Sequence, residues 1–513
     1  MNTRSWIRYP QPRRLLHAGL AMALTVGTVQ GAEPRIDVQS GAVTIPYFEA
    51  LFPDGELSRG WATMEQVGDT AMFELTRVER VEPITEPVAD PDFPADLAVV
   101  LEDFLESLVS DFAFPGAAMR VEVGDSVWRG AAGVGRVASG EPMDYTRRFR
   151  VASQTKAMVG QVALMLVDQG VLSLDDTVAD WLPELTLTNK DTILIRHLMR
   201  HQSGIFNHPD LDTFLFATAD APAAYTAPED WVAQADAQGP LFEPGTDYTY
   251  SNTGIVVLGL IIEAATGLPI KEVLRQMLFD PLDLIGTSFE DSPVFSYGPV
   301  MHGHVHDDCA ANAEECLCYA DVGLEDYPFC YDGVLEDYTF YSPSFFWAAG
   351  AVASTLDDML TFHRLRAEGA LLSEATQAEM LDLLAISEIT TPLSGETVDY
   401  ATGLNIQVLE RNARWLGHAG GIAGYSSSTL YSPQLQVGIS VVANRRGAWQ
   451  FEELDGSRSL TFELVPELLV LVEDTLGVPA AENRLAKRAL PQAPSFGPQH
   501  LDDGFIPPGL SRR

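Results

Sequence analysis

The stretch from Phe149 to Gly170, FRVASQTKAMVGQVALMLVDQG, places the strongest constraint on what this chain can fold into. From Gln154 to Val167 it is apolar on most faces, which is typical of a helix buried on all sides. Such a helix needs protein layers around it. A chain of 513 residues with 46% hydrophobic and 20% charged residues can supply them. We therefore expect this helix at the centre of a globular domain.

Ser153 and Lys156 stand at the start of this predicted helix. Residues three apart share one helical face, so the hydroxyl and the amine lie side by side at the positive end of the helix macrodipole. This pair is suited to be a nucleophile and its base. A serine there can also be a simple helix cap. The pairing gains weight because the chain has four lysines in all.

Two further motifs carry groups suited to acyl transfer. Tyr250 and Asn252, in EPGTDYTYSNTG, follow a Pro-Gly turn at a predicted helix start, where a phenol can move protons and a carboxamide can bind a substrate. His418 precedes Gly420 and Gly421 in WLGHAGGIAGYSSS, on or beside a predicted strand. The small residues allow a substrate backbone to approach, and the Gly421 amide can face an oxyanion. Singly, each residue has an ordinary structural explanation, but the ordered set of three favours catalysis.

Hydrophobic periodicity predicts an α+β fold, with an antiparallel sheet flanked by helices and an inserted, mostly α-helical lobe. We expect helices at 95–112, 192–200, 252–265, 270–278, 355–367 and 460–476, the last interrupted by Pro466. We expect strands at 117–123, 126–131, 403–409, 414–417, 426–431 and 437–443. The glycine run GVGRVA at 133–138 lacks a following helix, so we assign it to a turn rather than to a dinucleotide site.

In these motifs the chain resembles the penicillin-recognising serine hydrolases, the family of D-alanyl-D-alanine carboxypeptidases, class C β-lactamases and related esterases. S-Q-T-K, Y-S-N and H-A-G match the family's three motifs in order, and IRHLMRHQSGI and WAAGAVASTLDDMLTFHRL are similar too. The resemblance covers residues 96–477. It implies that Ser153 is acylated, that Lys156 is its base and that Tyr250 relays protons.

The same resemblance implies that Asn252, His418 and Gly420 bind substrate and that the backbone amides of Ser153 and Gly421 form the oxyanion hole, worth about 3 kcal/mol per donor. Lys156 can accept a proton if burial and positive potential depress its pKa. His418 stands where β-lactamases of the family carry lysine. A histidine, mostly neutral at pH 7, is a poorer anchor for a β-lactam carboxylate.

These features predict an exported serine hydrolase of the D-alanyl-D-alanine carboxypeptidase type. An esterase is the second candidate and a β-lactamase the third. A penicillin-binding or sensor protein that acylates and hardly turns over is the alternative of another class. A substrate carboxylate needs a local cation, for which Arg445 and Arg446 are the candidates. No G-x-S-x-G and no H-E-x-x-H occurs, which excludes two rival hydrolase mechanisms.

The chain is predicted to have four parts. Residues 1–32 are typical of an export signal, with arginines before the apolar run 15–26, a run shorter than the roughly 20 residues that span a bilayer. Residues 33–94 form an appendage and linker, and 95–480 the hydrolase domain, whose helical lobe occupies about 160–340. The Pro-rich tail 481–513 is predicted to be disordered. We expect a periplasmic or extracellular protein without a membrane span after signal cleavage.

A Cys- and His-containing insertion spans 299–346. In an exported protein, Cys309, Cys316, Cys318 and Cys330 predict two disulfides, either 309–316 with 318–330 or 309–318 with 316–330. His302, His304 and His306 alternate, so an extended chain would place them on one side. Their spacing matches no specific zinc motif, and we expect a polar loop without metal.

A formal net charge of −40 argues against binding to nucleic acid or to anionic membrane surfaces, because both would be repelled. We expect a small-molecule or peptide substrate and no cofactor. The oligomeric state is left open.

Overall fold

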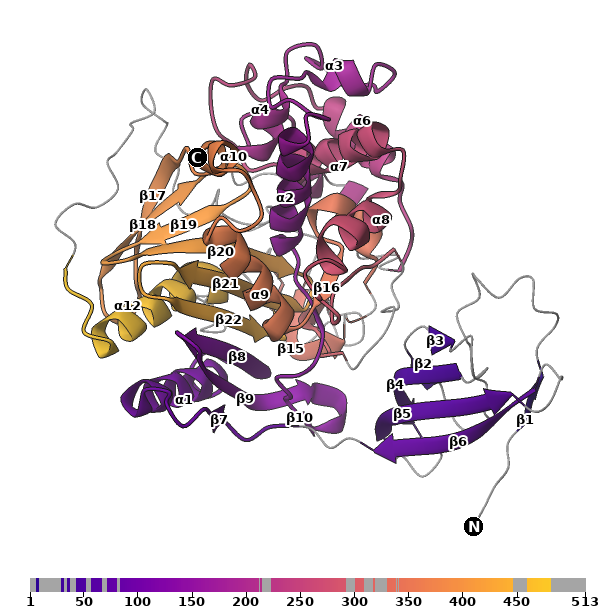
Figure 1. The fold of residues 1–513 in the computed structure, drawn as a ribbon, viewed down its shortest axis with the longest axis vertical. Coiled ribbons are helices and arrows are strands. Elements are labelled where there is room, and N and C mark those ends of the chain that lie inside the picture. Colours follow the sequence, from indigo (N-terminus) through magenta and orange to yellow (C-terminus); the bar gives the residue numbers. More distant parts are fainter. Residues whose placement is uncertain are drawn as a thin grey trace. The chain divides into compact units, whose positions relative to one another are not determined.

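The computed structural model describes residues 84–480 except 212, 215–222, 292–299, 309–316, 319–329, 338, 340 and 446–458, and it describes the strands alone within residues 1–83. The chain divides into two units, Met1–Ile84 with Val294–Met301, and Thr85–Pro293 with His302–Arg513. Figure 1 traces the elements along the chain. Every residue of the predicted catalytic site lies in the second unit.

The first unit is an antiparallel sheet. Its strands run in the order β1-β6-β5-β4-β2, with β3 paired to β4. The bounds are β1 (Trp6–Arg8), β2 (Val29–Gly31), β3 (Arg35–Ile36), β4 (Val43–Leu51), β5 (Leu57–Gln66) and β6 (Met72–Arg80). β1 and β2 fall within the predicted export signal, whose apolar run 15–26 lies outside the described residues.

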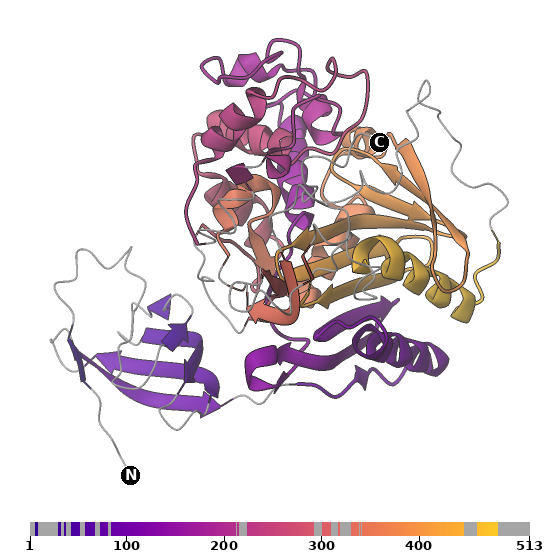
Figure 2. The ribbon, with the colours of Figure 1, turned by 180° about the vertical axis from the view of Figure 1, so that it is seen from behind.

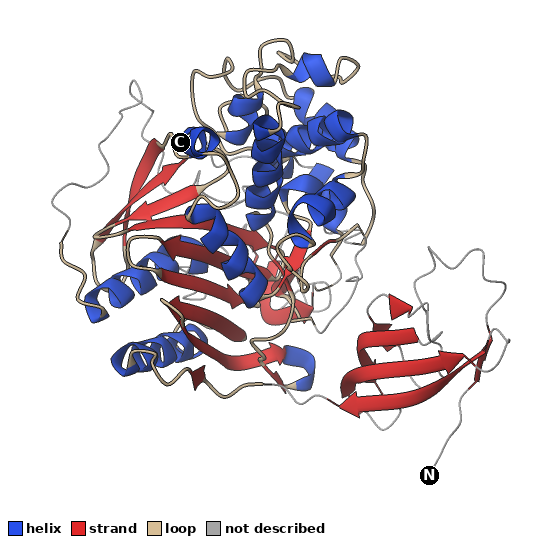
Figure 3. Cartoon of the chain, viewed as in Figure 1, coloured by secondary structure: helices blue, strands red, loops and turns tan. Residues whose placement is uncertain are grey.

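The second unit is built on a large antiparallel sheet (Figure 3). Its order is β10-β9-β8-β22-β21-β20-β19-β18-β17, with β7 on β9, so β8 near the start of the domain pairs with β22 near its end. The bounds are β7 (Val88–Ala89), β8 (Gly116–Val123), β9 (Ser126–Arg136), β10 (Glu141–Pro142), β17 (Leu384–Thr390), β18 (Thr397–Thr402), β19 (Gln407–Glu410), β20 (Arg414–Ile422), β21 (Tyr425–Ser432) and β22 (Val437–Ala443).

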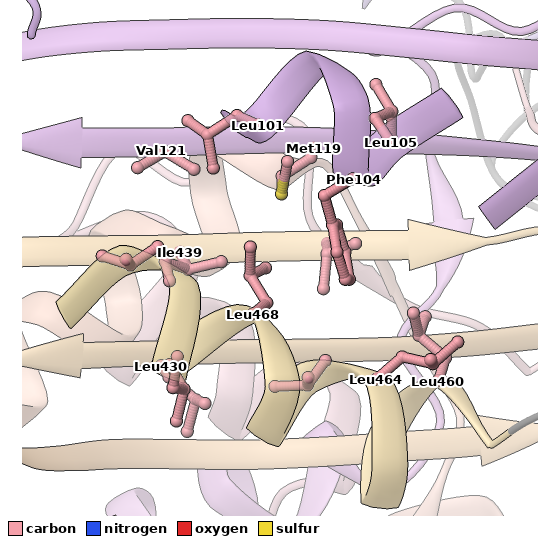
Figure 4. Packing of buried hydrophobic residues seen from close by; sticks show 14 of the residues in the cluster. Leu101, Phe104, Leu105, Met119, Val121, Leu430, Ile439, Leu460, Leu464 and Leu468 are labelled. Atoms are coloured by element: carbon pink, nitrogen blue, oxygen red, sulfur yellow. The ribbon is translucent and has the colours of Figure 1, made fainter. Parts of the chain in front are cut away.

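Two terminal helices cover one face of this sheet. α1 (Ala95–Ser110) buries five apolar residues spaced for one helical face: Leu97, Leu101, Phe104, Leu105 and Leu108. α12 (Val465–Thr475) follows a π-helical turn, Leu460–Leu464, and has Pro466 in its first turn, where its missing N–H costs no hydrogen bond. Figure 4 shows leucines of both helices packed against Met119, Val121, Leu430 and Ile439 of three neighbouring strands. Seen from behind, the yellow α12 lies across the sheet (Figure 2).

The other face carries α9 (Leu356–Ala367) and the helical lobe. A Cβ on Gly438 would meet Leu360 of α9, whereas neighbouring Ile439 belongs to the core on the opposite face. The buried helix α2 (Gln154–Asp168) lies between the sheet and this lobe (Figure 1). The remaining helices are α3 (Val178–Trp181), α4 (Ile195–Met199), α6 (Pro228–Asp236), α7 (Asn252–Thr266), α8 (Ile270–Leu274) with the π-helical turn Arg275–Phe279, and α10 (Glu374–Met380). Short 3-10 turns are η2 (Val137–Ser139), η3 (His208–Asp210), η6 (Pro343–Phe345) and η7 (Trp347–Ala349).

Small sheets complete the unit. β11 (Phe149–Arg150), β16 (Val352–Ser354) and β12 (Ser288–Phe289) form one of them, and β11 leads directly to α2. The insertion contributes β13 (His304–Asp308), β14 (Leu317–Cys318) and β15 (Cys330–Asp337). The polar loop predicted for the histidine run is therefore wrong: β13 pairs with β15, and His302 and His304 are buried. Cys318 and Cys330 are register partners across β14 and β15, whereas Cys309 and Cys316 lie outside the described residues. The disulfide pairing and the disordered tail stay predictions.

The α+β fold is confirmed, with three differences in detail. The turn predicted at 133–138 is wrong, because β9 continues to Arg136 before η2 begins. β17 and β18 carry no sequence prediction, since most side chains of β17 are half-exposed and no clear alternation marks it. The predicted strand at 403–409 begins later, at Gln407. Among the described helices, none alone is long and apolar enough to cross a membrane, and α7 passes that test only together with residues 270–279, at a bend of 77°.

Candidate active site

Ser153 lies at the start of α2 and does not act as a capping side chain. The residue before it, Ala152, is buried and has φ +50°, a conformation that costs a non-glycine residue about 1–3 kcal/mol. Ser153 makes no side-chain capping bond; instead its Oγ lies 2.6 Å from Lys156 Nζ. The strained turn therefore directs the hydroxyl to the lysine rather than to the helix terminus.

Lys156 is fully buried, and the lobe fixes its amine from two sides. Nζ donates to the Ala349 carbonyl at 2.9 Å and lies 4.9 Å from the centre of the Tyr250 ring. Ala349 belongs to η7, and Tyr250 precedes α7. Residues nearly 200 positions apart thus meet the pair that the sequence identified.

His201 supports Tyr250 and was not singled out in the sequence. Its ring stacks on the Tyr250 ring with centroids 4.3 Å apart, and its Nδ1 accepts the Ser251 amide N–H at 3.3 Å. Burial, and then the charge of Lys156, hold the pKa of His201 well below its usual value, so the ring is neutral. His201 also has φ +56°. The sequence signal for His201 was its place in the motif HQSG, directly after the end of a helix.

Asn252 is held by a second residue that sequence reasoning missed, Asn207. The Asn207 Oδ1 accepts both the backbone N–H of Asn252, at 2.9 Å, and its Nδ2–H, at 3.1 Å. Asn207 Nδ2 in turn donates to Asp210 Oδ1 at 3.1 Å, which fixes both amide orientations. The Asn252 Oδ1 is consequently the free end; it is buried and has no hydrogen-bond partner within the described part of the chain. The helix cap of α7 is Ser251, not Asn252.

The strand β20 brings His418 and the glycines to Ser153. A Cβ built on Gly420 would overlap the Val151 carbonyl and lie 3.1 Å from the Ser153 amide nitrogen, so only glycine permits this approach. Gly421 follows on the same strand, where it pairs with Ser426. Its role in an oxyanion hole stays a prediction.

His418 is an uncharged member of the site. Its Nδ1–H donates to the Ala419 carbonyl at 2.6 Å, which leaves Nε2 as an acceptor. Burial, followed by the positive charges of Lys156 and Arg366, lowers the pKa of His418 to about 3. The ring is therefore neutral at pH 7, in the direction that the reference pKa of histidine already indicated.

The structure does not bring the remaining candidate residues to Ser153. Arg445 donates to the Ala113 carbonyl at 3.1 Å, in the loop between α1 and β8, and Arg446 lies outside the described residues. The His302 amide donates to the Gly135 carbonyl, and the His304 amide to the Asn444 carbonyl. Over the described residues, no group of three potential metal ligands occurs, and the side chain of His306 is not described.

The comparisons with known proteins agree with this geometry. The family model described as Beta-lactamase matches residues 101–460, a range that includes all three motifs. Penicillin-binding protein 4* of Bacillus subtilis (strain 168) is 24% identical over 362 residues, which make up 69% of this chain and 73% of that protein. Esterase EstB of Burkholderia gladioli is 30% identical over 220 residues, 40% of this chain and about half, 54%, of the esterase.

A similar fold occurs in a solved structure of a D-stereospecific amidohydrolase from Streptomyces sp. The TM-score is 0.57 at 26% sequence identity, and the match covers 71% of this chain and 100% of that one. The matching relatives thus cleave or bind different compounds on one scaffold. The choice of substrate has to be argued from the site itself.

Proposed function

The chain belongs to the β-lactamase family of serine hydrolases, and we propose that it is an exported enzyme that hydrolyses D-alanyl-D-alanine peptides through an acyl-enzyme on Ser153. The observation that carries the proposal is the 2.6 Å contact between Ser153 Oγ and Lys156 Nζ, in a turn where the serine caps nothing. A hydroxyl so close to a buried amine can lose its proton as it attacks a carbonyl.

The proposed reaction has two steps. Lys156, in its neutral form, takes the Ser153 proton while Oγ attacks the peptide carbonyl, and the backbone amides of Ser153 and Gly421 stabilise the oxyanion. Tyr250 passes a proton to the departing amine, so the C–N bond breaks and the terminal D-alanine leaves. Water then attacks the ester, with Tyr250 relaying its proton, and Ser153 is restored together with a free carboxylic acid.

A peptide substrate is supported by the orientation of Asn252. Because Asn207 holds the Asn252 Nδ2–H, the side chain presents Oδ1, an acceptor, and a substrate has to bring an N–H donor to it. A peptide backbone supplies such a donor next to the scissile carbonyl. An unpaired buried acceptor costs about 1–3 kcal/mol, which is recovered by a substrate of this kind.

A second candidate, an esterase or amidase with an uncharged leaving group, is favoured by the cations of the site. The positive groups that act on His418 are Lys156 and Arg366; the first contacts Ser153, and the second donates to Gln161 and Leu404. Lys156 contacts Ser153, Arg366 is enclosed by protein and Arg445 donates to Ala113, so none of these three described cations is placed to pair with the terminal carboxylate of a dipeptide. Such a substrate would then bind less well than its amide.

Paired substrates separate the two candidates. Initial rates are measured on an N-acyl-D-alanyl-D-alanine peptide, on its C-terminal amide, on a short-chain nitrophenyl ester and on a chromogenic cephalosporin, with Ser153→Ala as the blank. Higher kcat/KM on the free peptide than on its amide supports the carboxypeptidase. Turnover of the ester alone would overturn it. A β-lactam adduct that persists without turnover would instead identify a binding or sensor protein.

A further inference from the structure

Arg366 is a buried guanidinium that the catalytic scheme does not use. It extends from α9 toward α2 and is 1% exposed. Its Nε donates to Gln161 Oε1 at 3.2 Å, and one Nη donates to the Leu404 carbonyl at 3.2 Å. The other terminal nitrogen, Nη1, has no hydrogen-bond partner among the described residues. The guanidinium has five N–H donors, and only two neutral acceptors among the described residues bind them.

The charge of Arg366 is not compensated by any of the described residues around it. Burial lowers its pKa to about 9, so the guanidinium is still protonated at pH 7, and no described carboxylate acts on it. Its neighbours His363 and His418 are basic groups, and both have a lowered pKa partly because of Arg366. The protein has a formal net charge of −40, yet no described carboxylate lowers the energetic cost of this buried cation. An isolated buried charge costs several kcal/mol unless a counter-charge accompanies it.

Two further unpaired polar atoms belong to residues beside Arg366. The bond from Arg366 fixes the Gln161 carboxamide, so its Nε2 is the free end, and that atom is buried without a partner in the described chain. His363 precedes Arg366 by one helical turn on the same face of α9, and its Nε2 is likewise buried and unpaired. Arg366 Nη1 and Gln161 Nε2 are N–H donors, and His363 Nε2 is one when it carries the ring proton.

We propose that a small monovalent anion of the halide class, such as chloride, binds between α2 and α9 on Arg366, Gln161 and His363. These residues offer unpaired N–H groups on side chains next to one positive charge, and a halide is bound by such donors. Each of the three side chains is at most 1% exposed, and this enclosure favours a halide over a carboxylate or a phosphate ester. None of these three residues is among those expected to react with or bind the substrate, although the charge of Arg366 acts on His418.

Anomalous diffraction tests the site in the unaltered protein. Crystals are grown with bromide replacing chloride, and data are collected at the bromine absorption edge. An anomalous peak within hydrogen-bond distance of Arg366 Nη1 supports the proposal. Density without an anomalous signal at that position means water, and a peak confined to the protein surface means surface binding; either result overturns the proposal.

Thermal unfolding gives an independent measure. Chloride is titrated at constant ionic strength against gluconate, and the melting temperature is expected to rise saturably, on the order of 2 °C. Arg366→Met keeps the buried volume and removes the charge, and it should abolish this response. Arg364→Met is the matched control on the same helix, because Arg364 is 37% exposed and pairs with Glu122. The same chloride response in Arg366→Met as in the wild type would contradict an anion at this residue.

Discussion

Two groups of buried ionisable residues, one on each face of the main sheet, differ in how completely their hydrogen bonds are made. On the α12 face, Glu473 accepts the backbone N–H groups of Asn412 and Ala413 and the Trp415 Nε1–H, and Glu467 accepts those of Leu393 and Ser394. On the α2 face, the basic cluster of Lys156, His201, His363, Arg366 and His418 includes buried polar atoms without partners in the described chain.

The difference separates structural charges from functional ones. Each glutamate of α12 hydrogen-bonds the backbone of one hairpin turn. Glu473 binds the turn between β19 and β20, and Glu467 binds the turn between β17 and β18, so both turns are held against the helix. The basic cluster lies among left-handed residues, Ala152, His201 and Asn405, and Asn405 Nδ2 donates to the Lys156 carbonyl at 3.1 Å. Strain and unmet hydrogen bonds gathered around a nucleophile are typical of a site organised for reaction.

The largest expected effect is on the basic side. Lys156→Met should lower kcat/KM by about 10³-fold and leave the melting temperature within a few degrees, because the lysine serves the reaction more than the fold. Steady-state kinetics and calorimetry measure the two quantities. Lys190→Met, at a half-buried surface position, is the control. Near-wild-type turnover in Lys156→Met would show that another base operates.

On the opposite face the pattern should reverse. Glu473→Ala leaves two buried N–H donors and one partly buried donor without an acceptor, and we expect a loss of about 3 kcal/mol in the free energy of unfolding. The kcat of the remaining folded enzyme should be unchanged. Asp474→Ala, which removes an exposed partner of Arg411, should cost less than about 1 kcal/mol. An equal loss in both variants would refute the structural role of Glu473.

Acid should destabilise the protein through its buried histidines. His208 and His418 each have a pKa near 3, lowered mainly by burial, against 6.5 in the unfolded chain. Between about pH 3 and pH 6.5, both histidines are therefore protonated in the unfolded state and neutral in the folded state. Stability is complete above pH 6.5 and falls by about 1.4 kcal/mol per pH unit for each histidine as the pH drops toward 3. Urea unfolding at pH 7, 6 and 5 measures the slope, and His208→Asn should reduce it by one proton; a flat profile contradicts buried neutral rings.

A smaller effect concerns the orientation of Asn252. Asn207→Leu frees the Asn252 amide to rotate, so kcat/KM for a peptide with an N–H beside the scissile carbonyl should fall by about 10-fold. The N-methyl analogue of the same peptide lacks that donor and should be hydrolysed equally by both enzymes. Asn412→Ala, at the β19–β20 turn, is the control. Equal losses on both substrates would mean that Asn207 only stabilises the fold.

The sequence predicted the scaffold and the primary residues because both are local patterns. Periodicity located α1, α2, α7 and α9, and short motifs located Ser153, Lys156, Tyr250 and His418. What it missed depends on contacts across the fold. Asn207 meets Asn252 at a separation of 45 positions, and Arg366 meets Gln161 at a separation of 205. No local pattern marks an asparagine or an arginine for such contacts, and the half-exposed β17 lacks the alternation that identifies a strand.

Labelling with a fluorophosphonate, followed by intact-mass spectrometry and peptide mapping, tests most directly whether Ser153 is the nucleophile. We expect one adduct per chain, located on the peptide that contains Ser153, absent in Ser153→Ala and formed far more slowly in Lys156→Met. An adduct of the same stoichiometry in Ser153→Ala, or one mapped to another residue, would contradict the acyl-enzyme on Ser153.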